Sequence, residues 1–184
     1  MLAKESKKKV IALVGASAVG KSTVESILEE EYGMRKGISY TTRPKRHYEV
    51  DGVHYYFTTE QYINQLLMSD ELAEMTTFNG WTYALAREEL VDSDVIVVEP
   101  QGLQQIIENF GRENVFVVYL TYPDKQRLIR SLVARNDDDV EEVIRRFLAD
   151  KEDMKGMYNV CDIAIRNEDS SVTAKMINSI TKNM

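Results

Sequence analysis

The hydrophobic pattern of this 184-residue chain alternates between short apolar runs and amphipathic stretches. The unbroken apolar run Val10–Val14 predicts a buried strand, and Lys21–Glu31, with apolar residues at helical spacing, predicts the helix that follows it. Two further β-branched runs are each followed by helical periodicity, namely Asp94–Val98 before Leu103–Phe110 and Val115–Leu120 before Lys125–Ala134. Three such units predict a mainly parallel sheet with helices on both faces.

The segment from residue 37 to about residue 90 breaks this alternation. It contains one helical stretch, Thr59–Met68, among several short β-like pieces. These pieces are Gly37–Thr41, Val53–Phe57, Leu72–Phe78 and Trp81–Leu85. We therefore expect an inserted subdomain of mixed α and β structure beside the parallel sheet.

The last part of the chain begins with a charged stretch, Asn136–Glu142. A long helix through about Tyr158 and a closing strand at Asp162–Arg166 are predicted after it. The final helix is predicted at about Ser171–Lys182, with three apolar residues at helical spacing packed on the sheet: Val172, Met176 and Ile180. No repeat or Pro/Gly/Ser-rich linker separates these parts, so we expect one domain over residues 1–184.

The composition narrows the class of protein. A hydrophobic content of 43% and a charged content of 29% are those of a globular domain, and no apolar run approaches the roughly 20 residues that cross a bilayer. The net charge of −7 argues against a nucleic-acid-binding surface. The lysine-rich start precedes an apolar run too short for a signal peptide, so we expect a cytoplasmic location. With Cys161 as the single cysteine, neither an intramolecular disulfide nor a cysteine metal cluster can form.

A glycine-containing segment follows the first predicted strand. Residues 15–22 read Gly-Ala-Ser-Ala-Val-Gly-Lys-Ser and match the phosphate-loop pattern G-x-x-x-x-G-K-[ST] between a strand and a helix, where this motif belongs. Backbone N–H groups of such a loop, aided by the positive end of the helix dipole, bind phosphate oxygens. The alternative is a chance match in a turn that leads into a helix, and the flanking strand and helix argue against it.

The motif gives its residues a nucleotide-binding role. Lys21 would reach the β- and γ-phosphates of ATP, and the Ser22 hydroxyl would complete part of the Mg²⁺ shell. The expected ATP-binding residues are Gly15, Ala16, Ser17, Ala18, Val19, Gly20, Lys21, Ser22 and Thr23, with Ser22 as the metal ligand. The loop alone does not distinguish ATPases, GTPases and kinases.

Hydroxyl and guanidinium groups gather in the inserted segment. They are Ser39, Tyr40, Thr41, Thr42, Arg43 and Arg46, followed by Glu49, Asp51 and Tyr55. Each arginine can grip a phosphate with paired N–H donors, and the hydroxyls of Ser39 and Tyr55 can supply further donors. On charge alone, a second phosphate site and a solvated basic turn are both open.

This segment resembles the guanylate kinase family, whose GMP-binding pattern is S-x-T-T-R-x-x-R-x-x-E-x-x-G-x-x-Y. The matching residues are Ser39, Thr41, Thr42, Arg43, Arg46, Glu49, Gly52 and Tyr55. The resemblance extends to the phosphate loop, Glu74–Tyr83, Glu99–Gly102 and Arg135–Arg146. It implies that Glu74 reads the guanine base and that the acceptor phosphate is held by Ser39, Arg43, Arg46, Tyr55 and Tyr83.

The chemistry of a carboxylate at Glu74 agrees with that role. Guanine presents adjacent N1–H and N2–H donors, which one carboxylate can accept in parallel, whereas adenine has an acceptor at N1. A glutamate in this position therefore favours guanine. The alternative is an exposed glutamate on an edge strand.

The chain departs from the family's pattern at two places. Leu85 stands where the family has a hydroxyl that helps with the base, so one hydrogen bond to the base is missing from the pattern. Val97 stands where the family has the first aspartate of D-x-D-x-Q-G, and Glu99 replaces the second. Magnesium coordination through the first carboxylate is thus lost or rerouted, and we expect Glu99 to bind the base or a magnesium-bound water.

Two arginines flank the acidic stretch near residue 140. Arg135 and Arg146 match the two lid arginines of the family, which implies that they close over ATP. Such cations would neutralise the moving phosphoryl group, and the closing segment would exclude water. The alternative is a surface helix with Arg145 and Arg146 paired to acids at helical spacing: Glu141, Glu142 or Asp150.

Together these patterns and the resemblance predict a P-loop NTPase three-layer α/β fold with a parallel central sheet, an inserted nucleoside-monophosphate-binding subdomain and a helical lid. The expected core covers about residues 8–36, 93–134 and 150–184, the subdomain about 37–90, and the lid about 135–149. The expected activity is transfer of the γ-phosphoryl group of MgATP to GMP or dGMP by a monomer or homodimer. The expected catalytic residues are Lys21, Arg43, Arg135 and Arg146. A kinase for another nucleoside monophosphate and a non-catalytic binding module of the same fold are the alternatives.

Overall fold

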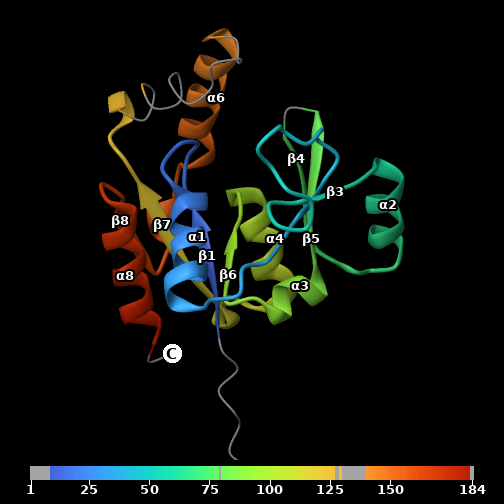
Figure 1. Ribbon diagram of the computed structural model, residues 1–184, viewed down its shortest axis with the longest axis horizontal. Coiled ribbons are helices and arrows are strands. Elements are labelled where there is room, and N and C mark those ends of the chain that lie inside the picture. Colours follow the sequence, from blue (N-terminus) through green and yellow to red (C-terminus); the bar gives the residue numbers. More distant parts are fainter. Residues whose placement is uncertain (1–8, 79, 127–128, 130–139, 183–184) are drawn as a thin grey trace, which may run out of the picture.

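The computed structural model describes residues 9–78, 80–126, 129 and 140–182. Figure 1 shows two sheets side by side, each with its own helices. No helix among these residues is both long and apolar enough to span a membrane.

The first sheet, here called the core sheet, has four parallel strands within the described residues. In spatial order they are β6 (Val95–Val97), β1 (Val10–Val14), β7 (Val115–Thr121) and β8 (Ile163–Arg166). The sequence of β1 is apolar throughout and that of β7 is apolar up to Leu120, because helices cover both faces of a sheet of this kind. The predicted mainly parallel sheet is confirmed.

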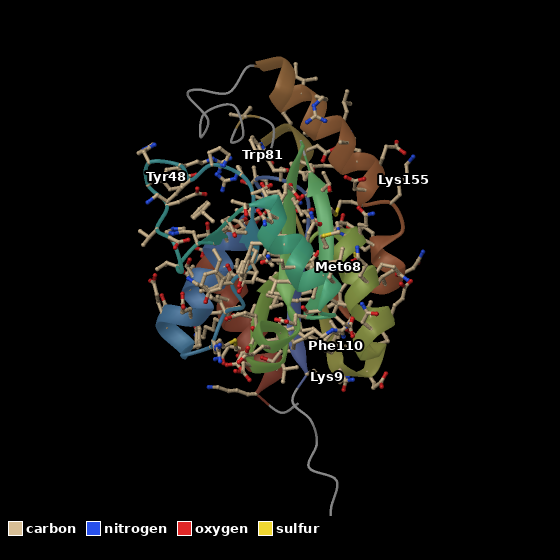
Figure 2. All side chains as sticks on the ribbon, turned by 90° about the vertical axis from the view of Figure 1, so that its right-hand side faces the viewer. Lys9, Tyr48, Met68, Trp81, Phe110 and Lys155 are labelled. Atoms are coloured by element: carbon tan, nitrogen blue, oxygen red, sulfur yellow. The ribbon has the colours of Figure 1, made fainter. Side chains whose placement is uncertain are left out.

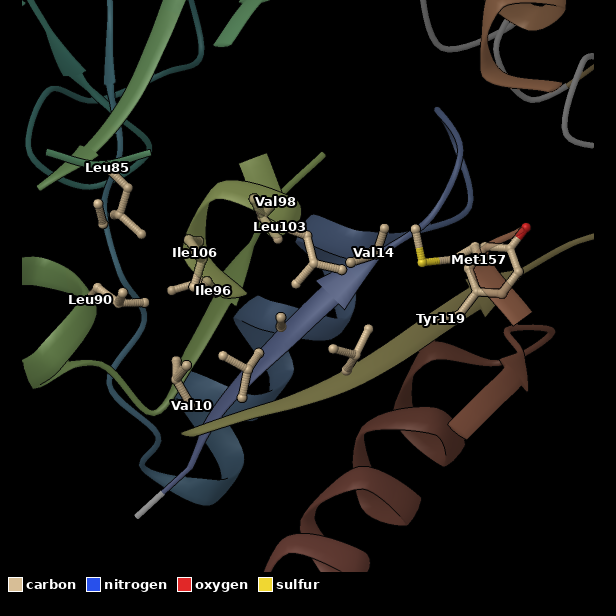
Figure 3. Close-up of a cluster of buried hydrophobic side chains, with 14 of the residues drawn as sticks. Val10, Val14, Leu85, Leu90, Ile96, Val98, Leu103, Ile106, Tyr119 and Met157 are labelled. Carbon is tan, nitrogen blue, oxygen red and sulfur yellow. The ribbon is translucent and has the colours of Figure 1, made fainter. Parts of the chain in front are cut away.

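Helices cover the core sheet on two sides, and the side chains of β1 alternate between them. Ile11 and Leu13 pack with α1 (Lys21–Tyr32) and α8 (Ser170–Thr181). On the other face, β1 packs with α4 (Pro100–Phe110) and α7 (Met157–Val160), and the labelled side chains of this cluster are visible in Figure 3. The resulting arrangement is helix, sheet, helix, as the sequence predicts.

The second sheet, here called the acceptor sheet, is mixed. Its order is β3 (Tyr56–Phe57), β2 (Tyr40–Thr41), β5 (Trp81–Ala86) and β4 (Leu72–Phe78), with β3 and β2 parallel and the other pairs antiparallel. α2 (Glu60–Met68), capped by the Thr59 side chain, covers one face. A small apolar cluster lies between them: Ile63, Leu66, Leu72 and Ala84.

Several elements connect or extend these two sheets. α3 (Arg87–Asp92) leads from the acceptor sheet back to β6, and the 3-10 helix η1 (Arg112–Asn114) precedes β7. α6 (Val140–Asp153) rises beside the phosphate loop at the top of Figure 1. Most of the helix predicted at Lys125–Ala134 lies outside the described residues.

The structure corrects three of the predicted elements. The strand predicted at Gly37–Thr41 is limited to β2. The strand predicted at Val53–Phe57 is limited to β3, because the preceding residues form a turn in which the Gly52 N–H donates to the Tyr55 carbonyl. The helix predicted to run through Tyr158 is interrupted after Asp153, and Gly156 at φ 80° precedes α7. Glycine adopts this left-handed conformation without strain, which allows the chain to turn between the two helices.

The predicted packing of α8 is wrong by one position. Val172 and Met176 are 56% and 44% exposed, whereas Ile180 is partly buried against the core. The buried face is formed by Thr173, Ala174, Ile177 and Asn178. This face, which packs on α1, combines the fully buried Ile177 with small and polar residues, so the buried face is not the predicted stripe.

Candidate active site

The phosphate loop joins β1 to α1. Neighbouring atoms lie so close to two of its glycines that a side chain would not fit. A Cβ atom at Gly15 would lie 2.5 Å from the carbonyl oxygen of Leu120. Gly20 has φ 94°, and a Cβ atom there would lie 2.5 Å from Nδ2 of Asn167. Glycine is therefore required at both ends of the loop, for sterics and, at Gly20, also for backbone conformation.

Asn167 holds the loop from the end of β8. Its Nδ2 donates to the Val19 carbonyl at 2.7 Å and to Ser170 Oγ at 3.3 Å. The residue is 1% exposed, so this hydrogen bond to the loop is buried. Asn167 could not be predicted from the sequence, because no local pattern links it to a loop almost 150 positions earlier.

Lys21 lies folded against the same loop. Its Nζ donates to the carbonyl oxygens of Gly15 and Ala16, and it forms an ion pair with Glu99 Oε1 at 3.3 Å. Glu99 is the residue that precedes α4 at the end of β6. The structure therefore brings two predicted site residues, Lys21 and Glu99, into direct contact.

The hydroxyl residues of the loop differ in their surroundings. Ser22 and Thr23 are exposed in the first turn of α1. Ser17 instead contacts α6, because Asp150 accepts a hydrogen bond from its backbone N–H at 3.0 Å and another from its Oγ at 3.2 Å. Asp150 is only 5% exposed, so it is a buried acid beside the loop and not the surface residue of the alternative interpretation.

Arg43 is the centre of a polar cluster on the acceptor sheet. Its guanidinium pairs with Glu49 through two contacts, Nη2 to Oε1 at 2.6 Å and Nη1 to Oε2 at 3.0 Å. The Arg46 backbone N–H also donates to Glu49, at 2.7 Å. Burial alone would raise the pKa of Glu49, but these hydrogen bonds outweigh it and lower that pKa. Arg43 is thus held in place by a buried, ionised carboxylate.

Aromatic side chains complete this cluster. The Arg43 guanidinium carbon lies 5.5 Å from the ring centroid of Tyr55, and the rings of Tyr55 and Tyr83 are 5.9 Å apart. Burial raises the pKa of Tyr55 to about 12, so its hydroxyl remains a hydrogen-bond donor at neutral pH. Arg46 is more exposed, and its Nη1 donates to the Tyr48 hydroxyl at 3.2 Å. Three of the predicted phosphate-binding side chains, those of Arg43, Tyr55 and Tyr83, therefore lie together.

The other predicted phosphate-binding residue, Ser39, immediately precedes β2. Its carbonyl oxygen accepts a hydrogen bond from the Tyr56 N–H at 3.0 Å, which joins the starts of β2 and β3. Figure 2 shows Tyr48 and Trp81 toward one end of the molecule and Phe110 toward the other. The loop that follows Ser39 contains Tyr48, so it lies toward the opposite end of the molecule from Phe110, the last residue of α4.

Glu74 lies on β4 and is 6% exposed, so the alternative of an exposed edge-strand glutamate is wrong. It pairs across the sheet with Leu85, and the next pair on the same face is Thr76 with Tyr83. Burial, together with the negative charge of Glu99, raises the pKa of Glu74 to about 8. Glu74 therefore shares a face with Tyr83 and approaches Glu99.

The two residues that depart from the family pattern have structural roles. Leu85 is 2% exposed and packs in the cluster of Figure 3 with Leu90 and Ile106. Val97 is partly buried against the cluster on the α1 side of the core sheet. Burial raises the pKa of Glu25, an acid near Val97 that no sequence motif indicates, to about 7.

The predicted lid is described only in part. Arg135 lies outside the described residues, and of Arg146 only the position within α6 is described. The lower part of α6 is tied to the core by Lys151, which forms an ion pair with Asp124 at 2.9 Å.

A phosphate loop between β1 and α1 of a parallel sheet, with a second sheet carrying an arginine and tyrosine cluster, defines a P-loop protein of the α/β class. The guanylate kinase family model matches residues 7–184, and the chain belongs to that family.

Comparisons with individual proteins agree. The chain is 32% identical to the guanylate kinase of Oceanobacillus iheyensis over 177 residues, which cover 92% of this chain and 84% of that protein. It is 30% identical to the guanylate kinase of Rhizobium etli over 180 residues, which cover 94% and 81%. The crystal structure of guanylate kinase from Anaplasma phagocytophilum matches with a TM-score of 0.74 at 23% identity, covering 97% of this chain and 87% of that chain. This likeness supports the predicted P-loop NTPase fold.

Proposed function

We propose that the protein transfers the γ-phosphoryl group of MgATP to GMP or dGMP, giving ADP and the nucleoside diphosphate. The observation that carries this proposal is the position of Glu74, a buried carboxyl group on the same sheet face as Tyr83. Membership of the guanylate kinase family and the names of the relatives support the same reaction.

ATP is the donor in this proposal, held by residues 15–23. Its phosphates would accept from the loop N–H groups, and Lys21 would exchange its bonds to the Gly15 and Ala16 carbonyls for phosphate oxygens. The Lys21 ammonium group already lies against the loop whose N–H groups would bind the phosphates, so this exchange requires little movement of the side chain.

Mg²⁺ would bind with the ATP phosphates, and the residues present fit such an ion. The exposed Ser22 lies in the first turn of α1, and the Glu99 carboxylate contacts the neighbouring Lys21. Mg²⁺ prefers oxygen ligands and commonly keeps several waters, so the hydroxyl, the phosphates and waters, one of which the carboxylate could hold, suffice. The ion would neutralise charge on the β- and γ-phosphates.

The acceptor phosphate would bind at the cluster on the acceptor sheet. Arg43 can offer it the guanidinium N–H groups that do not pair with Glu49, and the hydroxyl of Tyr55 is protonated at neutral pH. Ser39, Arg46 and Tyr83 would add the remaining donors. Glu49 already holds the Arg43 guanidinium group in a fixed orientation, which reduces the entropy lost when a phosphate binds.

Glu74 would read the base. An ionised carboxylate accepts from N1–H and N2–H of guanine in parallel, so guanine binding favours the ionised form of a group whose pKa lies near 8 in this structure. Glu99, close to Glu74, would contact the base or a magnesium-bound water.

The transfer itself needs no general base, because the acceptor phosphate is already an anion. Catalysis consists of placing it in line with the γ-phosphate and stabilising the charge of the transition state. Lys21 of the phosphate loop and Arg43 of the acceptor sheet would stabilise this charge. The lid arginines Arg135 and Arg146 would add to this stabilisation while the closed lid excludes water. We extend the proposal to a cytoplasmic enzyme that acts on small molecules as a monomer or homodimer.

A kinase for a different monophosphate is the second candidate, favoured by Leu85. Leucine has no hydroxyl group, and this side chain packs in the core cluster, so it offers no hydrogen bond to the base. A non-catalytic binding module is less well supported, because the phosphate loop retains its glycines, Lys21 and Ser22.

A coupled assay across GMP, dGMP, AMP, CMP, UMP and dTMP tests the proposal. We expect activity with GMP or dGMP and loss of turnover in the Lys21→Met variant, which removes the ammonium group but keeps a flexible side chain. Activity on another base with none on guanine nucleotides would refute the acceptor assignment. Near-normal activity of Lys21→Met would refute the donor assignment.

A further inference from the structure

The free edge of the acceptor sheet lies against the core through α4. Among the described residues, β4 is the last strand of that sheet and pairs only with β5, and α4 lies along its other side (Figure 1). An edge strand carries unpaired N–H and C=O groups along its free side. The question is therefore which groups of α4 pair with the backbone of β4.

Gln105 pairs with the edge as a neighbouring strand would. Its Oε1 accepts from the Met75 N–H at 3.0 Å, and its Nε2 donates to the Met75 carbonyl at 3.0 Å. One helical turn later, Asn109 Nδ2 donates to the Ala73 carbonyl at 3.2 Å. Residues four apart in a helix are about 6 Å apart along its axis, and residues two apart in a strand are about 6.6 Å apart, so the two spacings match.

Glu74 is the residue between these two anchored positions. Its backbone is therefore held on both sides, at Ala73 and at Met75, by amide side chains of one helix. Its carboxyl group lies close against the same helix at Gly102, where a Cβ atom would lie 2.6 Å from Glu74 Oε2. Gly102, Gln105 and Asn109 follow helical spacing and lie on one face of α4.

We propose that Gln105 is a specificity-determining positioning residue: by pairing with Met75 it sets the orientation in which Glu74 presents its carboxylate to the base. This inference rests on the proposed function, in which Glu74 reads guanine. Without Gln105, the β4 backbone keeps its pairing with β5 but loses its fixed distance from α4. Glu74 then loses the alignment that two parallel hydrogen bonds require.

The comparison of GMP with IMP reports on this alignment. Hypoxanthine keeps N1–H but lacks the 2-amino group, so it offers Glu74 one donor where guanine offers two. A well-placed carboxylate therefore prefers GMP, and a displaced one has less preference. A residue that merely stabilises the fold would change both activities by the same factor.

The experiment compares Gln105→Leu with Gln104→Leu. Leucine is similar in size to glutamine but cannot form the paired hydrogen bonds. Gln104 is the matched control, because it is the preceding residue of α4 and its side chain is exposed and bonded to Glu108 at 2.7 Å. Values of kcat/KM for GMP and IMP are measured in each variant, and thermal unfolding shows that each is folded.

We expect Gln105→Leu to lower kcat/KM for GMP by about 30-fold and that for IMP by no more than about threefold, so that the preference falls about tenfold. Asn109→Ala, which releases only the Ala73 carbonyl, should shift the preference in the same direction by a smaller factor and provides a second test if Gln105→Leu does not fold. Gln104→Leu should keep the preference of the parent chain.

An unchanged preference in both Gln105→Leu and Asn109→Ala overturns the inference, as does an equal loss of both activities. The parent chain separates this outcome from failure of the proposed function. A parent that does not phosphorylate GMP refutes the proposed function, and the inference with it, before any variant is compared. An active parent with an unchanged preference in the variants refutes the inference alone.

Discussion

Replacement of Glu74 by glutamine should raise stability at alkaline pH while it removes guanine recognition. The substitution keeps the shape of the side chain and abolishes its ionisation. Burial and Glu99 raise the pKa of Glu74 from its ordinary value of 4.5 to about 8. Below pH 4.5 the carboxyl group is neutral in the folded and unfolded chains alike, so its ionisation does not affect stability there.

The sign of the pH dependence follows from these two values. Between pH 4.5 and about 8 the unfolded chain loses the Glu74 proton while the folded chain keeps it, so the stability of the parent falls as pH rises. Above about pH 8 both states are ionised and the loss is complete. At about 1.4 kcal/mol per pH unit, this interval sets an upper limit of about 5 kcal/mol. Because buried sites respond as though their dielectric constant were about 20, we expect about 2–3 kcal/mol.

The measurement is urea unfolding of the parent and Glu74→Gln at pH 5, 6.5 and 8.5. The variant should have nearly the same free energy of unfolding as the parent at pH 5 and should exceed it by about 2–3 kcal/mol at pH 8.5. Its kcat/KM for GMP should fall about 100-fold, because glutamine offers one acceptor and one donor where guanine needs two acceptors. The exposed Glu71, close by at the start of the same strand, gives the matched control Glu71→Gln. A stability difference that does not change with pH would refute this reasoning.

Three further substitutions test other contacts. Asp150→Ala removes two hydrogen bonds to the phosphate loop, so thermal unfolding should show a loss of about 1–3 kcal/mol, which the exposed control Glu152→Gln should not show. Gly20→Ala places a Cβ atom against a buried amide at a positive φ, so calorimetry should find MgADP binding at least about tenfold weaker; unchanged binding would contradict it. Arg43→Lys loses the paired contact with Glu49, so steady-state kinetics should show KM for GMP rising about tenfold and KM for ATP changing less than about twofold. An equal rise in both KM values would argue against an acceptor role.

Local patterns in the sequence were sufficient for the core sheet and the phosphate loop. The strand β1 is apolar throughout and β7 is apolar up to Leu120, and the loop is defined by glycines and Lys21 within eight positions. Both signals concern neighbours along the chain. In the mixed acceptor sheet, the predicted strand Leu72–Phe78 matches β4, and Trp81–Leu85 ends one residue before β5 does. The strands β2 and β3 were predicted too long, because turns such as the one at Gly52 are closed by backbone hydrogen bonds that no side-chain pattern encodes.

Contacts between distant segments escaped prediction for a different reason. Asp150 and Asn167 reach the phosphate loop from more than 130 positions away, and in the sequence each is one polar residue among many. In α8, the predicted stripe was wrong because Val172 and Met176 are exposed, while the face that packs on α1 combines Ile177 with small and polar residues. The predicted roles of the site residues stay predictions, although the structure brings Arg43 and Tyr55 together and places Lys21 beside Glu99.

The attachment of the acceptor sheet to the core has a mechanical consequence. Ala73 and Leu85 belong to the apolar cluster of the core, although they lie on β4 and β5. Any rotation of the acceptor sheet must turn about this attached corner, and displacement grows with distance from the pivot. Glu74 adjoins the pivot and would hardly move, whereas the loop that carries Arg43 and Tyr48 follows β2, two strands away from β4, and would move farther. Under the proposed function, the bound base would then stay nearly fixed, and rotation of the acceptor sheet toward the core would move the acceptor phosphate toward the donor.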